Sequence, residues 1–310
     1  MSTYVGIDGG KSGLRVLVQS PDGRLYGEGP GFAYGRDDVA SIVTAVGEAV
    51  RPLDLPTAIA GVCAGLTGVP GDARMRQRVR QGIEDVLGAP ALLVEDVVIA
   101  HAGALGGAGA VACVGTGVTV LALSGSQRTG RIDGWGPIIG DRGSAYAIGQ
   151  RGLQAAAAAL DGAGPATRLS EAFVEELGGA GLHDVQDFYR DASPVARTAA
   201  FAAAVVADAD RGDPVAREIC LAAADDLARS VEAAGERAKL ADHERIASYA
   251  GRLLDSGTIL LQAFRARLTS SGWEVVRPRG GSLDGGVALA HSPHPTYHAI
   301  LESWKDTEEC

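Results

Sequence analysis

The sequence has few cysteines, few aromatic residues and no long apolar run. Its 310 residues include 4 cysteines, none in a CxxC pair, and aromatic residues make up 5% of the chain. Scattered cysteines in a chain of this size, without a secretion signal, predict reduced thiols rather than disulfides or a metal or iron–sulfur site. Because no segment is long enough to span a bilayer, we expect a cytoplasmic protein without a membrane partner.

Positive charge is also scarce. The formal net charge is −10, from 28 Lys and Arg against 38 Asp and Glu, and no basic run is present. This balance argues against nucleic acid or an anionic membrane as the main partner. An anionic ligand such as a nucleotide would instead be held by local devices, namely backbone NH groups, helix N-termini and a metal ion.

The length of the chain predicts two domains, with a ligand between them. Apolar patterning in the first hundred residues predicts strands at 4–7, 14–19, 24–29, 57–63 and 91–94, and helices at 37–50 and 71–87. Three strands followed by helix, strand, helix and strand form the βββαβα pattern. We expect a mixed sheet with helices on both faces.

The same pattern starts again at Gly109. Further strands are predicted at 109–115, 118–124, 127–133, 246–250 and 273–277, and helices in 145–241, at 259–270 and from about 285. The alanine-rich helices are interpreted as packing material. Two similar halves would then face each other across a cleft.

A glycine-rich turn, Asp8 to Gly13, is predicted between the first two strands. It contains an acid, a base, a hydroxyl and three glycines, which is more than a hairpin turn requires. Its glycines would let backbone NH groups approach a ligand, and Lys11 and Ser12 could donate to phosphate oxygens. Asp8 would repel phosphate unless it acted through Mg²⁺. Taken alone, a solvated hairpin turn explains the segment equally well, and a Walker A loop is excluded because a strand follows.

Asp96 follows the predicted strand at 91–94 and begins a helix. A helix-capping role explains an aspartate there. A carboxylate at the end of a strand could also accept the proton of an attacking hydroxyl. Its neighbour Glu95 is interpreted as a salt-bridge partner or a second ligand, and His101 as a packed residue.

The segment from Asp133 to Gly149 reads DGWGPIIGDRGSAYAIG and is dense in glycine. Such density predicts unusual backbone angles and the close approach of a ligand. Asp141 offers acceptors suited to sugar hydroxyls.

Taken in order, these segments resemble the acetate and sugar kinase, Hsp70 and actin superfamily. The closest likeness is to the N-acetylglucosamine kinases of the BadF/BadG/BcrA/BcrD ATPase family. The matching segments are IDGGKSG, EDVVIAHAGAL, VGTGV, DGWGPIIGDRGSAYAIG, SYAGRLL and GGVALA. The resemblance implies two actin-like (ribonuclease H-like) domains with mixed βββαβα sheets around a central nucleotide cleft. Residues 1–108 plus about 286–310 would form the N-terminal domain, and 109–285 the C-terminal domain with helical insertions.

The resemblance also implies the role of each site residue. Asp96 would be the base that deprotonates the sugar 6-hydroxyl, and Asp8 would hold Mg²⁺ through water. The residues expected to bind ATP are Gly9, Gly10, Lys11, Ser12, Gly115, Thr116, Gly117 and Gly251. Those expected to bind the sugar are Gly134, Trp135, Gly136 and Asp141.

Several positions depart from the family pattern. Val118 stands where the family usually has serine, Arg142 where it has glutamate, and Asp133 where it has glycine. The loop from Gly29 to Gly35 lacks the asparagine with which relatives usually contact the sugar. Losing a polar contact can weaken the binding of one substrate strongly, so the identity of the sugar stays open.

The leading prediction is an ATP-dependent kinase of an amino sugar, with N-acetylglucosamine first and glucosamine or another hexose as alternatives. An ATPase that activates a partner protein and a catalytically silent sugar or nucleotide sensor are the competing interpretations. The likeness also implies a homodimer.

Overall fold

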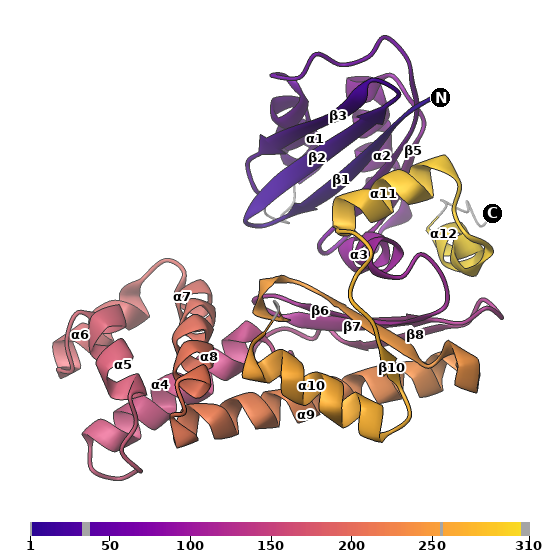
Figure 1. The fold of residues 1–310 in the computed structure, drawn as a ribbon. Helices are drawn as coiled ribbons and strands as arrows, with labels where there is room; N and C mark the ends of the chain where they lie inside the picture. The colour runs from indigo at the N-terminus through magenta and orange to yellow at the C-terminus, as the bar shows by residue number, and fades with distance from the viewer. Residues whose placement is uncertain (1, 33–37, 255–256, 305–310) are drawn as a thin grey trace.

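The protein is described by a computed structural model that covers residues 2–32, 38–254 and 257–304 (Figure 1). Its first sheet has the order β3-β2-β1-β4-β5. The strands are β1 (Thr3–Gly10), β2 (Gly13–Ser20), β3 (Gly23–Gly29), β4 (Ile59–Leu66) and β5 (Ala91–Glu95). β1 pairs antiparallel with β2 and parallel with β4. The predicted mixed sheet is therefore confirmed, while residues 33–35 of the Gly29 to Gly35 loop lie outside the described residues.

The second sheet repeats this arrangement, with the order β10-β9-β6-β7-β8. Its strands are β6 (Gly109–Val114), β7 (Val118–Leu123), β8 (Thr129–Asp133), β9 (Ile246–Ala250) and β10 (Glu274–Val275). β6 takes the place of β1, because it too pairs antiparallel with the next strand and parallel with a strand that follows a helix.

The helices divide into layers on the two sheets. They are α1 (Asp38–Val50), α2 (Ala73–Leu87), α3 (Asp96–Ala104), α4 (Ala145–Leu160), α5 (Leu169–Leu177), α6 (Leu182–Arg190), α7 (Pro194–Ala200), α8 (Ala202–Asp210), α9 (Pro214–Ala238), α10 (Ile259–Ser270), α11 (Ser282–His291) and α12 (His298–Ser303). Short 3₁₀ turns span Asp242–Glu244, Arg252–Leu254 and Pro295–Tyr297.

Three buried clusters define the layers. Val5, Ile7 and Leu14 face α1 and α2 on one side of the first sheet. A second cluster lies between the two sheets and includes residues of α3 and α11. The outer face of the second sheet is covered by α9 and α10. Figure 1 shows α3 and α11 lying between the two sheets. The expectation of helices on both faces is confirmed.

Glycines allow α11 to lie close to β1 and α3. A Cβ on Gly6 of β1 would lie 2.9 Å from the backbone N of Val287, and one on Gly285 would overlap the carbonyl oxygen of Ile99. The helix near the end of the chain therefore packs on its first strand. Among the described residues, no helix is long and apolar enough to cross a membrane.

Candidate active site

The first sheet brings polar residues together where its parallel strands end. β1, β4 and β5 run parallel, so their carboxyl ends lie along one edge. Asp8 lies near the end of β1, Thr67 directly follows β4, and Asp96 directly follows β5. This edge is where open α/β sheets commonly bind ligands.

The predicted extent of the first glycine turn is wrong. Gly9 and Gly10 belong to β1 and pair across the ladder with β2, so Lys11 and Ser12 form the turn, and both are exposed. Close neighbours require both glycines. A Cβ on Gly10 would lie 2.8 Å from the hydroxyl of Thr67, and one on Gly9 would lie 2.9 Å from the ring of Phe32.

A cation not expected from the sequence pairs with Asp8. Arg15 lies opposite Asp8 in the register of β1 and β2, and its guanidinium forms an ion pair with the carboxylate. The Asp8 side chain is 16% exposed and that of Arg15 is 61% exposed. Burial raises the pKa of Asp8, Arg15 opposes this effect, and the charge of Asp96 raises the pKa further. The influence of Asp96 agrees with the sheet topology, which places the ends of β1 and β5 along the same edge.

Asp96 is the first residue of α3, and every following residue of that helix is buried. The hydroxyl of Thr67 donates a hydrogen bond to Asp96 Oδ2 at 2.7 Å, and the backbone NH of Val97 donates to Oδ1 at 2.8 Å. Hydrogen bonds from two elements therefore fix the direction of the carboxylate. Thr67 was not expected as a site residue, although a hydroxyl directly after a buried parallel strand is a signal that could have found it.

Glu95 is a salt-bridge partner, which was one of the two interpretations of this residue. Its carboxylate accepts a hydrogen bond from Arg131 Nη1 at 2.9 Å, and Arg131 lies on β8 in the second sheet. Burial raises the pKa of Glu95, Arg131 lowers it, and Asp96 raises it. The ion pair connects the residue before Asp96 with the second sheet.

The second glycine turn lies between β6 and β7 and is held by the start of α4. The NH of Gly115 donates to the carbonyl of Gly117 at 2.9 Å. The NH groups of Ala145 and Tyr146 donate to the carbonyls of Gly115 and Thr116 at 3.0 and 3.2 Å. The turn is thus fixed and uncharged, and Gly115 and Thr116 are exposed.

The glycine-rich loop after β8 is organised by the buried carboxylate of Asp133. Its Oδ1 accepts from the NH of Asp141 at 2.6 Å, and its Oδ2 accepts from the NH of Arg142 at 3.1 Å. Asp133 and Asp141 have φ of 64° and 55°, and Gly134 and Gly136 have φ of 78° and 87°. This succession of left-handed residues explains the glycine density.

The two side chains expected to bind sugar are placed differently. The Asp141 carboxylate is turned toward the second glycine turn and lies against Gly117. Burial raises the pKa of Asp141, while the backbone NH groups of Val118, at the start of β7, and of Gly136, in its own loop, lower it. The Trp135 side chain is 71% exposed. Trp135 is therefore free to contact a ligand, and Asp141 fixes the loop to the turn.

Gly251 lies beside the second turn. It follows β9 with φ of 103°, and a Cβ there would overlap the carbonyl oxygen of Val114 at the end of β6. Cys113, one residue before, is close enough to the first sheet that Asp96 and Asp8 add to the effect of burial in raising the pKa of its thiol. The ends of β6 and β9 therefore face the carboxylates that follow the first sheet.

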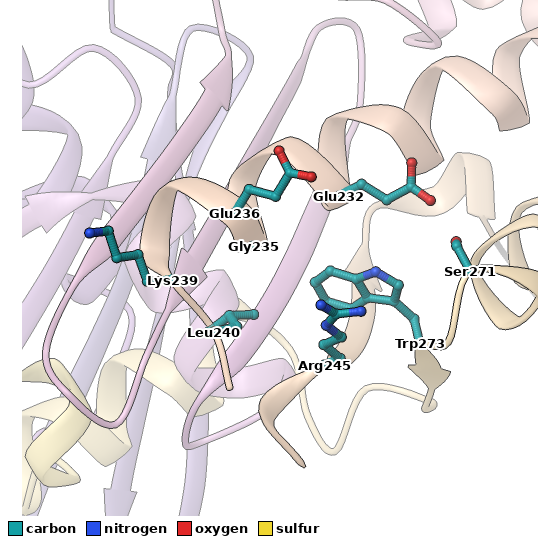
Figure 2. Close-up of a pocket in the computed structure, with 8 residues that line it drawn as sticks. All are labelled: Glu232, Gly235, Glu236, Lys239, Leu240, Arg245, Ser271 and Trp273. Carbon is teal, nitrogen blue, oxygen red and sulfur yellow. The ribbon is translucent and has the colours of Figure 1, made fainter. Parts of the chain in front are cut away.

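The cavity in Figure 2 is separate from these residues. It has a volume of about 230 Å³ and lies at the C-terminal end of α9, with Glu232 and Glu236 projecting from the helix near Trp273 and Arg245. A second cavity, of about 270 Å³, lies between β5 and α12. None of the predicted site residues lines either cavity.

Known proteins resemble this chain in sequence and in fold along most of its length. Over 311 residues, the chain is 26% identical to the N-acetylmuramic acid/N-acetylglucosamine kinase of Clostridium acetobutylicum, covering 94% of this chain and 99% of that protein. The structure of a candidate N-acetylglucosamine kinase from Chromobacterium violaceum matches with a TM-score of 0.72 and 26% identity, over 93% of this chain and 99% of that one. The ROK hexokinase of Thermus thermophilus shares the fold alone, with a TM-score of 0.51 and 17% identity over 93% of this chain and 98% of that one.

The profile of one protein family spans both glycine turns, Asp96 and the loop after β8. It matches residues 5–271, which is most of the chain. The chain therefore belongs to the BadF/BadG/BcrA/BcrD ATPase family.

Proposed function

We propose that the protein is an ATP-dependent kinase of an amino sugar, with N-acetylglucosamine as the first substrate and its 6-hydroxyl as the acceptor. The observation that carries the proposal is the Asp96 carboxylate, which begins a buried helix, is oriented by Thr67, and lies near Asp8. The kinases named among the relatives support the substrate class.

Asp96 acts as the general base. It accepts the proton of the sugar hydroxyl as that oxygen bonds to the γ-phosphorus, and the bond from this phosphorus to the ADP oxygen breaks. The hydrogen bonds from Thr67 and Val97 hold the carboxylate in one orientation, so little reorganisation is needed at the moment of transfer.

The two glycine turns hold ATP. Gly9 to Ser12 and Gly115 to Gly117 contact the phosphates, and Gly251 lies by the adenosine. Asp8 suits a magnesium ion carried by the nucleotide, because Mg²⁺ in such sites is held by one or two carboxylates together with water and phosphate oxygens. When bound, Mg²⁺ would neutralise phosphate charge.

Gly134, Trp135 and Gly136 form the sugar-binding part of the site, and the buried Asp141 supports it by fixing the loop to the second glycine turn. Trp135 offers an exposed ring, and the backbone at the two glycines allows close approach. The Arg142 side chain is 60% exposed beside the buried Asp133. A cation there disfavours a protonated amine, which supports N-acetylglucosamine over glucosamine.

The wider assignment is part of the same proposal. Residues 1–108 with about 286–310 form one domain and 109–285 the other, in keeping with the packing of α11 on β1. The enzyme is a cytoplasmic homodimer whose ligands are ATP and a small sugar.

The test measures ADP release with Mg·ATP across N-acetylglucosamine, glucosamine and plain hexoses. Asp96→Asn should lower sugar-dependent turnover by about 1,000-fold, within the range for loss of a general base. Asp22→Asn, which alters an exposed carboxylate in the turn between β2 and β3, should leave turnover unchanged. Sugar-independent ATP hydrolysis would instead favour an ATPase that activates a partner, and the absence of turnover would favour a sensor.

A further inference from the structure

One ion pair joins the two sheets directly beside Asp96. Glu95 is the last residue of β5 in the first sheet, and Arg131 lies on β8 in the second. The Glu95 side chain is only 18% exposed and that of Arg131 is 47% exposed. An ion pair shielded on one side is worth more than a fully exposed pair, whose contribution is close to zero.

Arg131 is fixed at its backbone and at its guanidinium. Its carbonyl accepts a hydrogen bond from Arg237 Nη1 of α9 at 2.9 Å. Its Nη1 binds Glu95, while its Nη2 lies 3.3 Å from the position that a Cβ on Gly134 would occupy. One guanidinium group therefore binds Glu95 and lies beside Gly134, at the start of the loop after β8.

Glu95 transmits this contact to the proposed base. It directly precedes Asp96, at the point where β5 ends and α3 begins. Thr67 holds the Asp96 carboxylate from β4, and Arg131 holds the preceding residue from the second sheet. The base is thus anchored on one side by its own sheet and on the other by the sheet that carries the sugar-binding loop.

We propose that Arg131 is a positioning residue, which through Glu95 sets the distance between Asp96 and the loop that binds the sugar. This inference rests on the proposed kinase function. It assigns Arg131 no contact with the reacting atoms. Its effect is to keep the Asp96 carboxylate at the right distance from the sugar hydroxyl when the substrate binds.

A double-mutant cycle tests the pair. Arg131→Met and Glu95→Gln should each lower kcat about 10-fold, within the range of measured couplings between contacting residues. The KM for Mg·ATP should change less than about twofold, because uniform nucleotide binding is untouched. The double variant should be no slower than either single variant, and Arg131→Lys should recover most of the loss. Arg229→Met breaks two ion pairs within α9, with Asp225 and Asp226, and should leave kcat unchanged.

Three results would overturn the proposal: single variants with wild-type kcat, losses that multiply to about 100-fold in the double variant, or a loss confined to folded yield. Urea unfolding of each variant separates misfolding from mispositioning. If the wild-type enzyme turns over no sugar, the proposed function fails by itself. The urea midpoints of the single and double variants then test whether the Glu95–Arg131 pair couples the two sheets. Midpoint shifts that add strictly in the double variant would reject this coupling.

Discussion

The two sheets share one topology and differ in the chemistry at their strand ends. In both, a meander of three strands continues into two parallel strands, so β1 corresponds to β6 and β4 to β9. The first sheet ends in Asp8 and Asp96, with Arg15 beside them. The turn of the second sheet, Gly115 to Gly117, carries no charge. The same topology therefore carries charged side chains at the strand ends of the first sheet and an uncharged turn in the second.

The two halves also differ in what lies between their third and fourth strands. In the first, one described helix, α1, connects β3 to β4. In the second, α4 to α9 intervene between β8 and β9, and most of their buried residues belong to a single cluster with the sheet. The second sheet is therefore packed against more helices than the first, and Asp133 at its edge fixes the loop after β8.

The comparison is tested most strongly by removing one polar group from each sheet, Asp8 near the end of β1 and Thr116 in the turn after β6. Asp8→Asn should lower kcat/KM for Mg·ATP by about 100-fold, since the carboxylate proposed to hold the magnesium of Mg·ATP is lost. Thr116→Val should cost less than about 10-fold, because it removes one exposed neutral hydroxyl. ADP release at varied Mg·ATP measures both. Equal losses would mean that the two turns share the chemistry.

A second prediction concerns the joint between the halves. His101 of α3 contacts the carbonyl of Gly109 at the start of β6 at 3.1 Å and the hydroxyl of Tyr297 at 2.8 Å. Burial lowers the pKa of His101 from 6.5 to about 4. As pH falls, the unfolded chain takes up this proton first, so the stability is present above pH 6.5 and is lost between 6.5 and about 4.

At pH 5 this single group should lower the free energy of unfolding by about 2 kcal/mol relative to pH 7. Urea unfolding of wild-type protein and His101→Gln at both pH values provides the measurement. The variant should lose correspondingly less stability on acidification. Identical pH slopes for the two proteins would show that His101 titrates normally.

The smallest expected effect concerns stability and compares the two glycines of the second turn, Gly115 and Gly117. A Cβ on Gly117 would overlap the Asp141 carboxylate, whereas one on Gly115 meets no atom within 4 Å. Neither glycine has a positive φ. Gly117→Ala should therefore lower the free energy of unfolding by roughly 1 kcal/mol and Gly115→Ala should leave it unchanged. Equal denaturation midpoints for the two variants would contradict this view of Asp141.

Much of the fold could be predicted where the chain has clear local signals. The predicted strand at 246–250 and helix at 259–270 match β9 and α10, because glycine follows the strand and Thr258 caps the helix. The strand predicted at 57–63 instead spans Ile59–Leu66. β4 continues through Gly65, where the Ile99 side chain fills the space that a Cβ would need. The strand predicted at 273–277 is shorter, with Glu274–Val275 pairing as β10.

The site was predictable to the extent that it lies within one hairpin or follows one strand. The family and the two-sheet fold followed from motifs; the comparison with known proteins confirmed the family, and the structure confirmed the two sheets. Arg15 could have been found from hairpin register alone, since a two-residue turn at Lys11 and Ser12 places it opposite Asp8. Arg131 could not, because its contact with Glu95 depends on how the two sheets are placed, and no local pattern encodes that.

The close packing of α11 on β1 determines when the first sheet can finish folding during synthesis of the chain. Gly6 belongs to the first strand to be synthesised, and the helix that covers it begins at Ser282. Until about 290 residues have left the ribosome, one face of the first sheet is covered by α3 without α11, while the second sheet already has every strand. The half that is made first is therefore completed last, and a chain that stops before α11 leaves part of its first sheet exposed to chaperones and proteases.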